Sequence, residues 1–141
     1  ECVVALKILY DVDVGIKLDQ LTALSQLVEE RSGVALQPHK AVVGRGAFAH
    51  ESGMVVAGLL RDPFTAEAYE PHLVGQKRTV VLGKKSGVAS VQARADQLNL
   101  EMSQAQVAAL LEAVKTEAVR AKKPVSEEQF RMLATAIAAD K

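Results

Sequence analysis

The 141-residue chain contains a single cysteine, no tryptophan, few other aromatic residues and no excess of charge of either sign. A lone Cys2 cannot form an internal disulfide, and no Cys or His spacing is typical of a zinc site, so we expect a reducing, cytoplasmic compartment. Seventeen basic residues balance seventeen acidic ones, which argues against nucleic acid as a partner. No apolar run approaches the roughly 20 residues that a membrane-spanning helix needs, so no membrane partner is expected either.

The residues that are abundant, Ala, Val and Leu, favour helices packed through small side chains. Apolar residues recur at helical spacing over 1–10 and again over 18–33, where Gly33 provides a C-terminal cap. A first helix that begins at once, without a starting Met, suggests a chain cut from something larger. The expected fold class is mostly α with one or two short β segments.

Two capping boxes predict where the last two helices begin. Ser103 with Gln106, and Ser126 with Gln129, have the spacing at which a side-chain oxygen accepts a hydrogen bond from a free amide of the first turn. We therefore expect helices over 104–122 and 127–139. The apolar side of the first of these should be formed by Val107, Leu110, Leu111, Val114 and Val119.

The middle of the chain is less regular. A helix is predicted over 49–60, where Gly53 and Gly58 each cost about 1 kcal/mol relative to Ala, so the pair suggests close approach of another segment. The β-branched run over 79–83 favours a short strand, and the turn after it leads into a further helix.

The run His50, Glu51 and Ser52 raises the question of catalysis. Neighbouring residues on a helix point about 100° apart, so the three cannot form a nucleophile–base relay among themselves. His50 is equally well interpreted as a helix-start residue or as a ligand contact. His39 and His72 each follow a proline and are better interpreted as surface residues than as metal ligands. No spacing in the chain predicts a metal site.

The segment Leu82 to Gly87 presents two lysines and a serine between a probable strand and a helix. Free amides at a helix N-terminus attract anions, so Lys84, Lys85 and Ser86 are candidates for an anion site. A solvated turn explains the same residues, and the spacing of a Walker loop is missing. The residues alone predict a helical module and leave its function open.

The ordered series ECVVALK, DVDVGIKLDQLTALSQLVEERSG, QPHKAVVGRGAFAHESGM, AYEPHLVGQKR and VVLGKKSG resembles the region downstream of the catalytic barrel in the homocitrate synthase and 2-isopropylmalate synthase family. The pairing of AFAHESG with LGKxSG about thirty residues later is the specific part of this resemblance. Members of the family condense acetyl-CoA with a 2-oxo acid.

The resemblance implies small helical subdomains that follow a (β/α)8 barrel which is missing from this sequence. Residues 1–33 would be the last barrel helix and the first helix beyond it, 34–77 the first subdomain, and 78–141 the second. The divalent metal would be bound by the missing barrel, and no cofactor is expected in this chain. The implied partners are the barrel of the same or a partner subunit, within a homodimer, and the full-length enzyme's acetyl-CoA and 2-oxo acid.

The resemblance also assigns site residues. His50, with Glu51 and Ser52, matches the family's first histidine motif, and Tyr69 matches its tyrosine; these four would act on a partner barrel. Val55 stands where the family has a second histidine, and Lys85 stands where it has another. The chain alone should be inactive. A stand-alone accessory subunit and a non-catalytic helical interaction module remain as alternatives.

Overall fold

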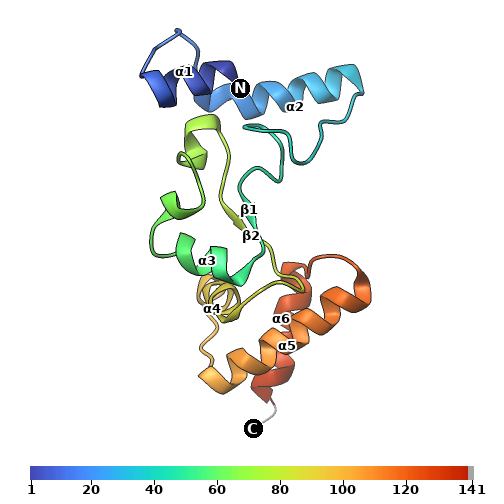
Figure 1. The fold of residues 1–141 in the computed structure, drawn as a ribbon. Helices are drawn as coiled ribbons and strands as arrows, with labels where there is room; N and C mark the ends of the chain where they lie inside the picture. The colour runs from blue at the N-terminus through green and yellow to red at the C-terminus, as the bar shows by residue number, and fades with distance from the viewer. Residues whose placement is uncertain (140–141) are drawn as a thin grey trace. The chain divides into compact units, whose positions relative to one another are not determined.

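A computed structural model describes residues 1–139 of the chain (Figure 1). The predicted class, mostly helical with one or two short β segments, is confirmed. None of the helices in this described part is both long and apolar enough to cross a membrane. The elements in chain order are α1 (Cys2–Tyr10), the 3-10 helix η1 (Leu18–Gln20), α2 (Leu21–Ser32), β1 (Ala49–His50), α3 (Gly53–Leu59), the 3-10 helices η2 (Pro63–Thr65) and η3 (Pro71–Val74), β2 (Thr79–Val80), α4 (Val88–Gln97), α5 (Gln104–Ala121) and α6 (Glu127–Ala139).

The chain folds as two compact units, and neither is continuous in sequence. Unit 1 consists of residues 1–49 and 67–79, and unit 2 consists of residues 50–66 and the chain from Val80 onward. The polypeptide therefore passes from one unit to the other three times. The division into 1–33, 34–77 and 78–141 concerns the subdomains that the family resemblance implies, and it stays a prediction.

Unit 1 is built around a small core beneath α1, α2 and η3. Its buried members are Val4, Val42, Phe48 and Val74. A buried hydrogen bond supports this core, because the Thr22 hydroxyl of α2 donates to the Val74 carbonyl over 2.6 Å. As predicted, α2 ends at Gly33, which adopts the left-handed conformation.

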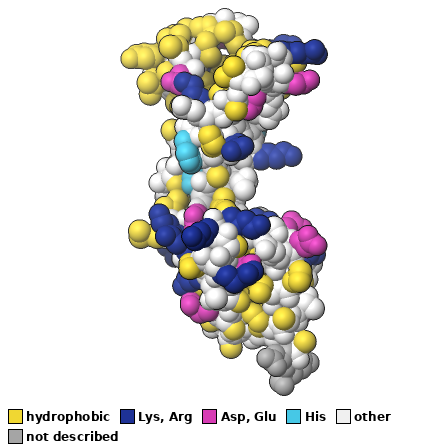
Figure 2. Space-filling view, turned by 90° about the vertical axis from the view of Figure 1, so that its right-hand side faces the viewer, with side chains coloured by type: hydrophobic (Ala, Val, Ile, Leu, Met, Phe, Trp, Pro, Cys, Tyr) yellow, Lys and Arg dark blue, Asp and Glu magenta, His cyan; other side chains and the backbone are white. Residues whose placement is uncertain are grey.

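The apolar side of α1 and α2 is largely exposed. Leu9 and Tyr10 are 71% and 72% exposed, and three apolar residues of α2, namely Leu24, Leu27 and Val28, are about half exposed. Figure 2 shows hydrophobic side chains gathered at the end of unit 1 that carries these helices. The predicted helices are thus present, but within this chain their apolar stripes have little to pack against.

Unit 2 has the larger core, formed where α4, α5 and α6 pack together. Both predicted capping boxes are confirmed: the Gln106 amide donates to the Ser103 hydroxyl, and the Gln129 amide donates to the Ser126 hydroxyl. Of the predicted stripe on α5, the first four members are buried, but Val119 is 60% exposed. This part of the prediction is wrong. Ala118 lies in the core instead, because position 118 comes two turns after Leu111 whereas position 119 is rotated about 100° further.

The segment predicted as one helix over 49–60 begins differently. Ala49 and His50 form strand β1, and α3 starts only at Gly53. The strand is set by distant partners, since the amides of Thr79 and Val81 donate to the carbonyls of Phe48 and His50 over 2.9 Å. This hydrogen-bond pattern is that of two short parallel strands. Likewise β2 is shorter than the predicted 79–83.

Candidate functional site

Tyr69 lies in a loop of unit 1 that runs from Glu67 to Thr79. Its ring packs edge-on against Phe48, with the ring centroids 5.6 Å apart and the planes at 76°. Partial burial raises the pKa of the Tyr69 phenol above its ordinary value of 10.0. At neutral pH the phenol is therefore protonated, and its hydroxyl can donate a hydrogen bond to a ligand or accept one.

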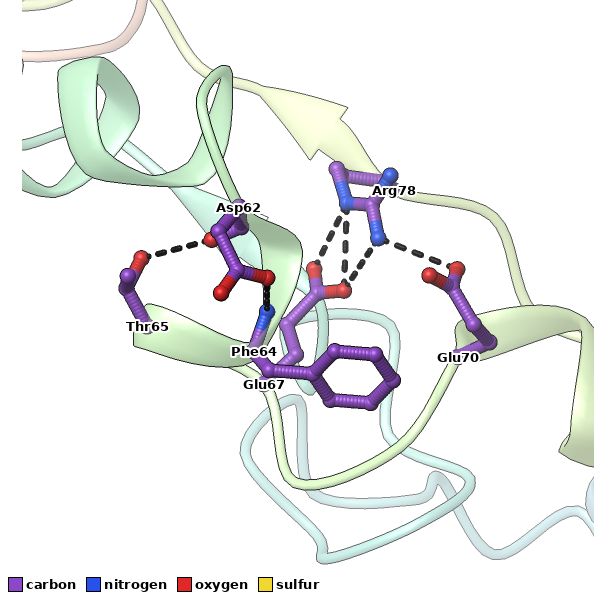
Figure 3. Close-up of polar contacts among 6 residues, drawn as sticks. All are labelled: Asp62, Phe64, Thr65, Glu67, Glu70 and Arg78. Atoms are coloured by element: carbon purple, nitrogen blue, oxygen red, sulfur yellow. Dashed lines mark hydrogen bonds and ion pairs between the residues drawn. The ribbon is translucent and has the colours of Figure 1, made fainter.

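An ion pair joins the two ends of this loop (Figure 3). The Arg78 guanidinium donates to both oxygens of Glu67, with the shortest distance 2.6 Å from Nη2 to Oε2, and also to Glu70 at 3.1 Å. The Glu67 side chain is 2% exposed, whereas that of Glu70 is 38% exposed. Hydrogen bonding to Glu67 is the main reason that the pKa of Arg78 is raised. The ion pair joins the two ends of the loop and so restricts the position of Tyr69 within it.

His50 ends β1, and Glu51 and Ser52 connect it to α3; all three belong to unit 2. All three are half-buried. Ser52 precedes α3 in an extended conformation without making a side-chain cap. Since they lie on a strand and a helix cap, the helical geometry expected for them is wrong.

Glu51 is tied to the lysine turn that follows β2. Its Oε1 accepts a hydrogen bond from the Lys85 amide at 3.0 Å. The same carboxylate lies against Gly83, where a Cβ would come within 2.5 Å of Oε1. The Gly53 amide also donates to the Lys85 carbonyl at 3.0 Å. The two motifs of the family resemblance, AFAHESG and LGKxSG, are therefore in direct contact through Glu51 and Gly53.

The three predicted anion-site residues differ in their surroundings. Ser86 is buried, and its hydroxyl oxygen accepts from the Gly83 amide at 2.9 Å and lies 3.4 Å from the Val81 carbonyl. Its hydrogen bonds therefore shape the turn. Lys84 and Lys85 are exposed. Whether the three bind an anion stays a prediction.

Val55, where the family resemblance implies a second histidine, lies on α3 and is 36% exposed. A half-exposed valine can neither donate nor accept a proton, so α3 offers no acid or base at this place. The predicted close approaches to the α3 glycines are confirmed: Gly53 touches the backbone of Gly87, and Gly58 faces the side chain of Thr65.

A pocket of about 420 Å³ in unit 2 was missed by the sequence analysis. It lies between the turn after β2 and the end of α5, and Lys84 is its one member among the predicted anion residues. Lys122 and Lys123 had only the pattern of a solvated helix end, so no local signal pointed to the pocket. Its lining residues are Glu51, Gly83, Lys84, Ala118, Val119, Lys122, Lys123 and Pro124.

The predicted site residues thus fall into two groups. Glu51 and the turn with Lys84, Lys85 and Ser86 come together in unit 2, whereas Tyr69 belongs to unit 1. Among residues 1–139, no group of three or more His, Cys, Asp or Glu side chains could hold a metal ion.

Comparisons with known proteins agree with the family resemblance that the two motifs suggest. Residues 42–122 match the family model described as homocitrate synthase post-HMGL domain-like. The chain is 39% identical to homocitrate synthase 1 of Nostoc sp. over 92% of its own length and 34% of that protein, and 36% identical to 2-isopropylmalate synthase 2 of Caldanaerobacter subterraneus over 94% and 35%. It is 43% identical to a homocitrate synthase of Methanopyrus kandleri over 82% and 29%.

The chain therefore spans about a third of the length of these curated relatives. The matched region includes both motifs, the tyrosine loop, and all of α3, α4 and α5. The chain belongs to the homocitrate synthase post-HMGL domain-like family.

Proposed function

We propose that this chain is the C-terminal, post-barrel part of a homocitrate or 2-isopropylmalate synthase-like acyltransferase, and that it acts as a lid and dimer contact. The complete enzyme would condense acetyl-CoA with a 2-oxo acid. The observation that carries the proposal is the family match over residues 42–122, in a chain that spans about a third of its synthase relatives.

The exposed apolar side of α1 and α2 supports this role. Apolar surfaces of this kind are typical of faces that another part of a protein covers, and a barrel on the same or a partner subunit is the cover that we propose. The divalent metal would be held by that barrel.

His50, Glu51, Ser52 and Tyr69 would contribute by positioning and hydrogen bonding at a neighbouring active site. Tyr69 suits this role because its phenol is neutral at physiological pH and its loop is closed by the Arg78–Glu67 ion pair. Glu51 would act through the turn that it holds, since its carboxylate is already bonded to the Lys85 amide.

Release of free thiol from acetyl-CoA tests the proposal. The 141-residue chain and a longer polypeptide in which it follows the barrel are each incubated with a divalent metal and a panel of 2-oxo acids. We expect thiol release from the longer polypeptide only, with kcat reduced at least about tenfold by Tyr69→Phe and unchanged by Lys17→Gln, a substitution at an exposed residue outside the site. Turnover by the isolated chain would contradict the proposal.

One observation favours a second function, a helical interaction module without catalytic connection: Val55 replaces the family's second histidine. Val55→His distinguishes the two, because a half-exposed position accepts the imidazole without loss of core. If the parent enzyme works with reduced acid–base assistance, the variant raises kcat by about tenfold or more and adds a pH dependence near the pKa of histidine. If Val55→His, His50→Ala and Tyr69→Phe all leave turnover unchanged, the module is the better description.

A further inference from the structure

A pairing between distant segments helps to shape the lysine-lined pocket of unit 2. Leu82 and Val125 form an isolated antiparallel bridge, in which the Val125 amide donates to the Leu82 carbonyl at 2.8 Å. The bridge brings the turn that contains Lys84 close to the end of α5 with Lys122 and Lys123. Lys122 closes α5 in the left-handed conformation, with φ of 51°, which turns the chain back toward the bridge. Lys84 thereby lines the same pocket as Lys122 and Lys123, although Lys122 follows it by 38 positions in the sequence.

The charge in this pocket is unbalanced. Lys84, Lys122 and Lys123 stand against one carboxylate, Glu51, and Glu51 already accepts a hydrogen bond from a backbone amide. None of the ion pairs formed by residues 1–139 involves any of the three lysines. Another acid, Glu117, bonds to Arg120 at 2.7 Å and also interacts electrostatically with Lys123. Like charges that line one pocket repel one another, and a bound anion would relieve that repulsion.

The walls between the lysines are apolar. Ala118, Val119 and Pro124 line the pocket, and Val119 is the side chain that the helical pattern placed in the core but that is exposed here. A volume of about 420 Å³ is within the range of small-molecule sites, which typically combine apolar walls with a few charged groups. A free inorganic anion would leave these walls uncovered. A ligand with a flat apolar body and a phosphate group would use both features.

We propose that this pocket binds an organic phosphate with an aromatic body, the chemical class of the nucleotides, with its phosphates between Lys84, Lys122 and Lys123 and its ring against Val119 and Pro124. The proposal can be tested apart from the proposed function, because all lining residues lie within unit 2.

Calorimetric titration of the 141-residue chain tests it, with ADP, adenosine and inorganic phosphate as separate probes. We expect saturable binding of ADP that weakens as salt is raised, with phosphate and adenosine each binding at least about tenfold more weakly. Lys84→Gln and Lys123→Gln should each weaken ADP binding by roughly fivefold to tenfold. Lys17→Gln, which removes the same charge from unit 1, should leave it unchanged.

Val119→Asp provides an independent variant, because an exposed position tolerates the carboxylate. It should abolish ADP binding while leaving the circular dichroism spectrum and thermal midpoint unchanged. Absence of saturable ADP binding would overturn the proposal. So would phosphate binding as tightly as ADP, or an equal loss with Lys17→Gln, since each would indicate unspecific attraction to surface charge.

Discussion

At the scale of single residues, Tyr69 connects burial with a measurable titration. Its pKa is raised because burial disfavours the charged phenolate, so the folded chain holds the proton more tightly than the unfolded chain. This contribution to stability is complete below pH 10 and is lost as the pH rises through the folded-state pKa.

Absorbance at 295 nm measures this directly, and Tyr10→Phe leaves Tyr69 as the only tyrosine of the chain. We expect a titration midpoint above 10 in the folded protein, which returns to the ordinary value in denaturant. Equal midpoints in the two states would contradict burial of Tyr69. Tyr69→Phe should leave no residual tyrosine signal in that background.

Gly75 is a second residue whose surroundings fix a prediction. It ends η3 with φ of 73°, and a Cβ there would collide with the carbonyl oxygen of Asp19. Gly15 has nearly the same φ, 70°, but nothing lies within 4 Å of its Cβ position. Gly15→Ala should therefore cost only the left-handed conformation, about 1 kcal/mol, whereas Gly75→Ala adds a steric clash and should cost at least about 2 kcal/mol more.

Urea unfolding of the two alanine variants checks this difference, and both positions lie in unit 1, so the same transition reports on them. Equal losses of stability in the two variants would mean that Asp19 can move away from position 75 at little cost.

At the scale of elements, the loop from Glu67 to Arg78 depends on one nearly buried carboxylate. Arg78→Met removes the guanidinium that binds Glu67 and should lower the free energy of unfolding by about 2 kcal/mol, because a nearly buried carboxylate loses its charged hydrogen-bond donor. Glu70→Gln, at the exposed rim of the same cluster, should cost less than about 1 kcal/mol. Hydrogen exchange in the loop should rise with Arg78→Met alone; similar rates in both variants would argue against the closure of the loop by Arg78.

The contact between the starts of α3 and α4 gives another matched pair. A Cβ at Gly53 would meet the Cα and N of Gly87 at 2.5 Å, and backbone atoms cannot move aside easily. At Gly58 the nearest atom is the Thr65 hydroxyl oxygen, at 3.1 Å, a side-chain atom that has to move by only a few tenths of an ångström and can keep its hydrogen bond to the Asp62 carbonyl. Gly53→Ala should destabilise by about 2 kcal/mol, whereas Gly58→Ala should be near neutral because the gain in helix propensity offsets the crowding. Thermal unfolding of both variants tests which substitution costs more stability. If α3 could shift freely, the order of the two costs would be reversed.

The elements also show what the sequence could predict. The capping boxes at Ser103 and Ser126 were predictable because the interacting groups are three residues apart. Strand β1 was not, because its pairing depends on Thr79 and Val81, some thirty residues later. The gathering of Lys84 with Lys123 depends on the bridge between Leu82 and Val125, so no local pattern records it. Tyr69 was identified only through the family resemblance, since it has no distinctive local spacing. His50 also stood out beside Glu51 and Ser52, but the residues alone left a helix start and a ligand contact equally open.

At the scale of the whole molecule, the exposed apolar residues are concentrated in the first 34 positions. They belong to α1, to the segment that follows it, to α2 and to the position just after its cap: Leu6, Ile8, Leu9, Tyr10, Val12, Val14, Ile16, Leu24, Leu27, Val28 and Val34. In water this surface favours any contact that covers it, at roughly 25 cal/mol for each Å² buried. A chain without such a cover should associate with itself.

Light scattering on the isolated chain tests this expectation. The average mass should rise with concentration, and more steeply at 25 °C than at 4 °C, because hydrophobic association weakens on cooling. Leu9→Glu combined with Leu24→Glu should return the chain to the mass of one copy, since both side chains are exposed and their replacement leaves the core intact. Met132→Glu, at an exposed apolar residue of α6 in unit 2, should leave the association unchanged. If the chain stays monomeric at all concentrations, or if Met132→Glu disperses it as well as the double variant does, the surface of α1 and α2 is not the face that other protein surfaces cover.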